Sequence, residues 1–119
     1  MTMSWYHPEE EHQVGEILGY QDAHPDTRYL VKFADGESYI CDYETSYDSE
    51  NSGELDIEME DPRYDEFFVV TLLITEILQD GTHRYNEWLS LDYRDFPALV
   101  EDADTGTIIY PPQTVAHAD

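Results

Sequence analysis

Basic residues are scarce in this 119-residue chain. One lysine, Lys32, and four arginines face 28 aspartates and glutamates, so the formal net charge is −23. Nucleic-acid backbones and anionic membranes are also negatively charged, and this charge therefore excludes direct binding to either. It favours a basic partner, a cation or a high-salt cytoplasm, with solubility alone as the simplest alternative.

Cysteine and long apolar segments are scarce too. Cys41 has no second cysteine to pair with, so no internal disulfide forms. We expect a buried, unreactive thiol there, because acidic surroundings raise the pKa of a thiol. No apolar stretch reaches the roughly 18 residues of a membrane span, and no basic region followed by an apolar segment marks a signal peptide. The expectation is one cytoplasmic domain, large enough to bury a core.

The longest apolar run, residues 66–78, is rich in β-branched and aromatic side chains. It is apolar on both faces, which predicts a strand in the middle of a sheet. Asp80-Gly81 follows, a pair typical of tight hairpin turns. A short helix over residues 87–96, giving an α+β fold, is the alternative. A tight turn would pair Leu72 with Leu89, Val70 with Leu91, Phe68 with Tyr93, Leu73 with Trp88 and Thr71 with Ser90.

Shorter apolar segments predict the other strands. A first strand is expected over residues 14–20, and a tight Asp35-Gly36 turn would pair Val31 with Ile40. The remaining predicted segments are strands over 28–34 and 37–43, loops over 21–27 and 44–53, and a last hairpin of 98–101 with 107–110. Residues 1–12 are expected to form a flexible arm or one helical turn, and residues 113–119 a disordered tail. The domain, residues 13–112, is thus expected to be mainly β: a small SH3-like, partly open barrel plus antiparallel hairpins.

The segment YLVKFADGESYICDYE, residues 29–44, resembles a strand pair of Tudor domains, with a Phe-x-Asp-Gly turn between aromatic-rich strands. Together with the expected strand at 14–20, it resembles the opening of an SH3-like or Tudor-type barrel. The resemblance covers about a quarter of the chain. It implies an aromatic patch for methylated lysine or arginine, made of Tyr29, Phe33, Tyr39 and Tyr43. Rim and packing positions are the alternative for these tyrosines.

Residues 54–60 alternate between acidic and apolar side chains, which predicts a half-buried strand with one acidic face. Alternate residues of a strand lie about 6.6 Å apart. Successive phosphates along one nucleic-acid strand are spaced comparably, at roughly 6–7 Å. The acidic row and its continuation are Glu54, Asp56, Glu58, Glu60, Asp61, Asp65 and Glu66.

Such a row is expected to bind a basic partner. In size and acidity the chain is similar to DNA-mimic inhibitors such as anti-restriction and anti-CRISPR proteins. That similarity implies inhibition of a DNA- or RNA-binding protein by occupation of its cleft. The alternative is an exposed edge strand whose charge prevents aggregation.

Metal-site and catalytic motifs are weak. Residues 48–56 partly match an EF-hand calcium loop, but Met59 stands where the closing bidentate glutamate is required, so we expect no tight calcium site. No nucleophile elbow or glycine-rich phosphate loop is present. The histidines match no zinc-binding spacing: they are His7, His12, His24, His83 and His117.

The sequence therefore predicts a non-catalytic acidic protein without cofactor or metal, which binds a basic protein surface through the acidic row. Two alternatives remain open. One is a halophile-adapted or uncharacterised β binding domain, in which acids would be spread rather than concentrated. The other is a calcium-binding or enzymatic domain.

Overall fold

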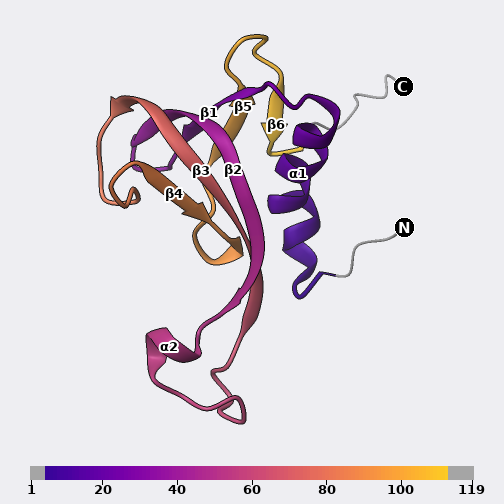
Figure 1. The fold of residues 1–119 in the computed structure, drawn as a ribbon, viewed down its shortest axis with the longest axis vertical. Helices are drawn as coiled ribbons and strands as arrows, with labels where there is room; N and C mark the ends of the chain where they lie inside the picture. Colours follow the sequence, from indigo (N-terminus) through magenta and orange to yellow (C-terminus); the bar gives the residue numbers. More distant parts are fainter. Residues whose placement is uncertain (1–4, 113–119) are drawn as a thin grey trace.

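A computed structural model describes residues 5–112. Its strands form one antiparallel sheet in the order β4-β3-β2-β1-β5-β6 (Figure 1). The strands are β1 (Arg28–Lys32), β2 (Ser38–Glu50), β3 (Glu66–Gln79), β4 (Trp88–Leu91), β5 (Leu99–Asp102) and β6 (Ile108–Tyr110). The helices are η1 (Pro8–His12), α1 (Val14–Ala23), α2 (Ser52–Leu55) and η2 (Tyr93–Asp95). The fold is mainly β, as the sequence predicts.

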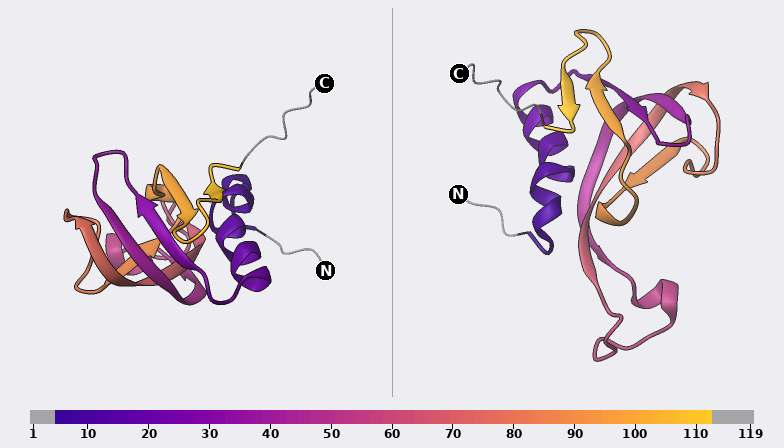
Figure 2. Two further views of the ribbon diagram at one scale, coloured as in Figure 1. Left: turned by 90° about the horizontal axis from the view of Figure 1, so that it is seen from above. Right: turned by 180° about the vertical axis from the view of Figure 1, so that it is seen from behind.

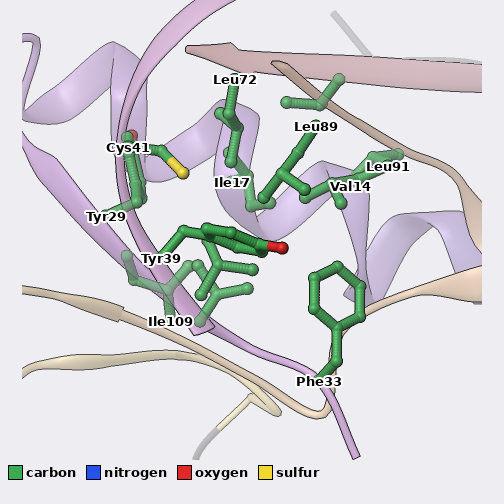
Figure 3. Packing of buried hydrophobic residues seen from close by; sticks show 13 residues of the cluster. Val14, Ile17, Tyr29, Phe33, Tyr39, Cys41, Leu72, Leu89, Leu91 and Ile109 are labelled. Carbon is green, nitrogen blue, oxygen red and sulfur yellow. The ribbon is translucent and has the colours of Figure 1, made fainter. Parts of the chain in front are cut away.

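Helix α1 packs against the sheet, in contact with β6 and β3 (Figure 2). Its fully buried Val14 and Ile17 join a core that strands β1 to β6 supply from their facing sides (Figure 3). No helix within residues 5–112 has the length and apolar character needed to cross a membrane.

The central strand is confirmed as β3, and so is its pairing with the following strand. Leu72 lies opposite Leu89, Val70 opposite Leu91, Leu73 opposite Trp88 and Thr71 opposite Ser90. The expected pair of Phe68 with Tyr93 does not form, because the ladder ends at Leu91 and Tyr93 lies in η2. The alternative helix over residues 87–96 is absent: β4 and the short η2 occupy that stretch.

The prediction of a tight turn at Asp80-Gly81 was wrong. The last bond between the two strands joins the Ile74 N–H to the Glu87 carbonyl at 2.7 Å, and residues 80–87 form a wide loop. Beyond Ile74, β3 continues alone alongside β2. Gly81 is needed for space rather than for a positive φ, because a Cβ there would lie 2.1 Å from Glu37 Oε1.

The strand expected at residues 14–20 is helix α1. Val14, Ile17 and Leu18 follow the i, i+3, i+4 spacing of one helix face, and all three face the core. With η1 directly before it, the segment docks as a helix on a sheet whose strands already have partners. The strand pair that resembles a Tudor domain is therefore preceded by a helix.

The β1–β2 hairpin forms, but its predicted register was wrong by one residue. Val31 lies opposite Tyr39, and Ile40 lies opposite Leu30. The loop contains three residues, with the Phe33 N–H bonded to the Glu37 carbonyl at 2.8 Å and Gly36 at φ 100°. A one-residue shift exchanges the faces of a strand, which explains why Tyr39 is buried and Ile40 only half-buried.

Two further predictions between β2 and β3 were wrong. The loop expected at residues 44–53 is largely strand, because β2 continues to Glu50 and pairs with β3 as far as Glu66. The acidic strand expected at residues 54–60 is absent: α2 is followed by a left-handed Asp56, φ 55°, and by turns. Within residues 5–112, no strand of the sheet pairs with this segment.

At the C-terminal end the last hairpin is confirmed, with β5 and β6 antiparallel. At the N-terminal end, η1 is the single helical turn that the sequence offered as an alternative to a flexible arm. The tail expected at residues 113–119 lies outside the described residues, as do residues 1–4.

Candidate functional site

Strands β2 and β3 extend as a two-stranded ribbon well beyond the other strands (Figure 1). The ribbon ends in residues 51–65, which we call the acidic tip. Figure 2 shows from behind that the tip projects from the rest of the fold. Six of the seven acids predicted to bind a partner lie in the tip, and Glu66 lies next to it.

The acidic tip has a defined backbone, anchored by Asn51, which is only 7% exposed. The Asn51 N–H donates to the Asp65 carbonyl at 3.1 Å, and the Asp65 N–H donates to Asn51 Oδ1 at 2.8 Å. The Asn51 side-chain amide also donates to the Arg63 carbonyl at 2.8 Å. These bonds close the two ends of the tip onto each other, so its acids are held on a fixed loop.

Four of the predicted acids have partners within the protein. Glu54 pairs with Arg94 at 3.2 Å, and Asp61 pairs with Arg63 at 2.9 Å. The Tyr64 hydroxyl donates to Glu66 at 3.0 Å. Asp65 accepts hydrogen bonds from Tyr93 and from His7, the latter at 2.7 Å. These four acids stabilise the tip and its attachment to the rest of the fold.

The other three acids, Asp56, Glu58 and Glu60, are exposed. Within residues 5–112 their side chains make no hydrogen bond or ion pair. Beside them Leu55 is 44% exposed and Met59 is 68% exposed. The tip therefore offers three unpaired carboxylates and two apolar side chains on one projecting loop.

The four aromatic residues of the Tudor-like pair come together, but inside the protein. Tyr29, Phe33 and Tyr39 are buried in the core (Figure 3), and Tyr43 is half-buried against it. The hydroxyls are also engaged, since Tyr29 donates to Gln21 at 2.7 Å and Tyr39 donates to Glu37. These side chains pack the core and do not form an open cage.

Cys41 lies on the same inner face and is fully buried, as expected. Burial raises the pKa of its thiol to about 12. The stretch that partly matches a calcium loop is divided between the end of β2, helix α2 and the turn after it.

Sequence reasoning missed a cluster around His83, at the end of the ribbon remote from the acidic tip. The carboxylate of Glu37 is 1% exposed and accepts from the Tyr39 hydroxyl and from the His83 N–H at 2.8 Å. Burial by itself would raise the pKa of Glu37, but the hydrogen bonds from Tyr39 and His83 outweigh it and lower that pKa. No local motif could reveal this cluster, because 46 residues separate Glu37 from His83.

A second missed contact involves His7, whose ring stacks on Tyr93 with centroids 3.9 Å apart. Both side chains donate to Asp65. Burial by itself would raise the pKa of Asp65, but these hydrogen bonds outweigh it and lower that pKa. Burial and the hydrogen bond to Asp65 raise the pKa of Tyr93 to about 12.

Replacing Asp65 by asparagine should lower the free energy of unfolding at pH 7 by about 1.5–3 kcal/mol, the usual range for hydrogen bonds to a charged group. A carboxyl group with a lowered folded-state pKa stabilises the protein above its unfolded pKa, near 3.8. That contribution is lost as the pH falls through the folded-state pKa. The difference between wild type and D65N should therefore be full at pH 7 and shrink below pH 3.8, as followed by urea unfolding.

The matched control is Asp56→Asn, an exposed acid without a side-chain partner among the described residues. Its effect should stay within about 0.5 kcal/mol at either pH. An undiminished D65N effect at acid pH would contradict the assigned role of the carboxylate.

No protein-family model, curated protein or solved structure matches this chain.

Proposed function

We propose that this chain is a non-catalytic binding protein that engages a basic protein surface through its acidic tip. The observation that carries this proposal is the projecting loop on which Asp56, Glu58 and Glu60 are unpaired and neighbour the exposed Leu55 and Met59 in the chain. Exposed carboxylates also occur elsewhere, for example at Asp22 and Asp26. Projection, unpaired charge and exposed apolar groups together distinguish the tip.

The placement of the arginines supports this proposal. Each is paired with a carboxylate nearby: Arg28 with Asp104, Arg63 with Asp61, Arg84 with Asp80, and Arg94 with Asp92 and Glu54. No arginine is therefore left to pair with the three free acids of the tip. A net charge of −23 also draws a basic partner in by long-range attraction.

The expected partner surface has lysines or arginines around a small apolar area. Apolar contacts at the centre and charged contacts at the rim are typical of protein interfaces. Opposite charge accelerates association. Apolar side chains that become buried on binding, such as Met59, hold the complex together. Because the acids lie on a folded loop, this proposal rests on the shape of the tip and not on a phosphate-like spacing.

A triple variant, Asp56→Asn with Glu58→Gln and Glu60→Gln, tests the proposal. The native host's lysate supplies the partner, which is captured on the wild-type protein, purified and titrated against both proteins by calorimetry. The variant should bind at least tenfold more weakly at physiological salt, because three charge contacts are lost. The free energy of unfolding of the variant should be unchanged or slightly higher than that of the wild type, since the three side chains face solvent.

The control removes the same amount of charge elsewhere, with Glu11→Gln, Asp22→Asn and Asp26→Asn, all exposed positions. It should retain wild-type affinity. Equal losses in both triple variants would mean that overall charge, and not the tip, attracts the partner. An unchanged affinity of the tip variant would refute the proposed site.

The nucleic-acid-mimic form of the proposal has its own test. If the purified partner binds DNA or RNA, a duplex of its preferred type should compete with this protein, and the competition should weaken steeply with added salt. A partner bound simultaneously by both would be engaged outside its nucleic-acid cleft.

A further inference from the structure

Two loops far apart in the sequence meet at the end of the ribbon remote from the acidic tip. The β1–β2 loop supplies Asp35 and Glu37, and the wide loop after β3 supplies His83. Each of the three offers one ligand atom, and these atoms lie within 4.8 Å of one another. We propose that Asp35, Glu37 and His83 form a binding site for a divalent first-row metal ion such as Zn²⁺.

The distances between the donor atoms fit such an ion. His83 Nδ1 lies 2.8 Å from Glu37 Oε1 and 3.9 Å from Asp35 Oδ2. With Zn–N and Zn–O bonds of about 2.0–2.2 Å, the ligand atoms of a tetrahedral site lie roughly 3.4 Å apart. The two observed distances fall on either side of that value, so small side-chain movements suffice to enclose an ion.

His83 is held as metal-binding histidines usually are. Its Nε2 lies 3.1 Å from Asp95 Oδ2, while Nδ1 faces the two proposed carboxylate ligands. Its ring is stacked on Phe33, with centroids 3.9 Å apart and planes 11° from parallel. A carboxylate on the second ring nitrogen fixes the ring and strengthens it as a ligand.

The charge around Glu37 also favours a cation. Asp35, Glu37 and Asp95 all lie within 4 Å of the single imidazole of His83. Among residues 5–112, no lysine or arginine pairs with any of the three, and the nearby Arg84 is bound to Asp80. The Tyr39 hydroxyl donates a hydrogen bond to Glu37 and holds its carboxylate in place. Gly81 packs so closely against this carboxylate that no Cβ could fit there. A single imidazole therefore lies among three carboxylates, one of which is fully buried.

Carboxylate oxygens and an imidazole nitrogen are ligands for Zn²⁺, Mn²⁺ or Fe²⁺. Three protein ligands leave a coordination position for water. The site is reachable from solvent, because the Asp35 side chain is 55% exposed. This inference is independent of the proposed partner, since the acidic tip is formed at the other end of β2 and β3.

Calorimetric titration of the full chain with zinc chloride tests the site. We expect saturation at one ion per chain, with affinity reduced at least tenfold in Asp35→Asn. This variant should fold normally, because its side chain is largely exposed. The control Asp22→Asn removes the same charge from another exposed position and should change affinity less than twofold. Equal effects of the two variants, or binding that does not saturate, would overturn the proposal.

Nuclear magnetic resonance of the histidine rings provides an independent readout. The His83 signals should shift until one equivalent of zinc is added, and those of His12 and His24 should not. Asp95→Asn should retain the stoichiometry and weaken binding about tenfold, the lower end of the effect of losing a carboxylate behind a metal-bound histidine. Shifts at other histidines with His83 unaffected would refute the site.

Discussion

Replacing Glu10 by alanine should lower the free energy of unfolding by about 3–5 kcal/mol. Glu10 is fully buried, and its carboxylate accepts three backbone N–H groups. Oε1 accepts from Tyr6 at 2.8 Å and His7 at 3.0 Å, and Oε2 accepts from Phe68 at 2.7 Å. Each buried donor left without an acceptor costs roughly 1–3 kcal/mol, and partial access of water to the cavity reduces the sum.

The effect should also appear locally, because Glu10 fixes the N-terminal segment on β3. Trp5 and Tyr6 both contact the ring of Phe68, with centroids 5.3 and 5.1 Å away. In the alanine variant, hydrogen exchange at the Phe68 amide should accelerate more than at the Leu72 amide. Chemical unfolding provides the global value.

The neighbouring glutamates are matched controls. Glu9 and Glu11 lie in the same short helix and are exposed. Alanine at either position should change stability by less than about 0.5 kcal/mol. If Glu10→Ala behaved like these two, the carboxylate would not be the link between the N-terminal segment and the sheet.

Replacing Leu72 by alanine should cost about 2–5 kcal/mol, the range for truncating a buried leucine. Leu72 is fully buried in the middle of β3, between Tyr43 on β2 and Leu89 on β4. The neighbouring strands are tied into the sheet, so they cannot close the cavity that the lost methyl groups leave. Urea unfolding with an unchanged denaturant slope would measure this loss.

Leu78→Ala is the control on the same strand. Leu78 is 49% exposed near the end of β3, so its truncation should cost well under 1 kcal/mol. A loss below 1 kcal/mol for Leu72→Ala would contradict its place at the centre of the sheet.

Much of the sheet could be predicted from local signals. The apolar run at 66–78 is long enough to identify a central strand, and it matches β3 closely. The pairing of Leu72 with Leu89 was predicted from a tight turn and supported by the apolar pairs that this register creates. The pairing forms even though the turn is wider than expected. The last hairpin and the buried Cys41 were predicted for similar reasons.

The acidic composition also followed from the sequence, but the shape of the acidic region did not. Alternation over residues 54–60 fits a strand only where a partner strand is available. Within residues 5–112, no strand of the sheet pairs with this segment, which forms α2 and turns instead. The acids therefore lie on a projecting tip, where three of them are unpaired, and not in the predicted straight row.

Local patterns in the chain were enough to predict the mainly β class, the central strand, its pairing with β4 and the strong negative charge. These features depend on periodicity and composition, which are local. The tertiary structure decided that residues 14–23 form a helix, that a three-residue loop shifts the β1–β2 register, and that Glu10 is buried. It also brought Glu37 to His83. The physical reason is that a short segment adopts the conformation its neighbours can pair with or cover, and those neighbours are distant in the sequence.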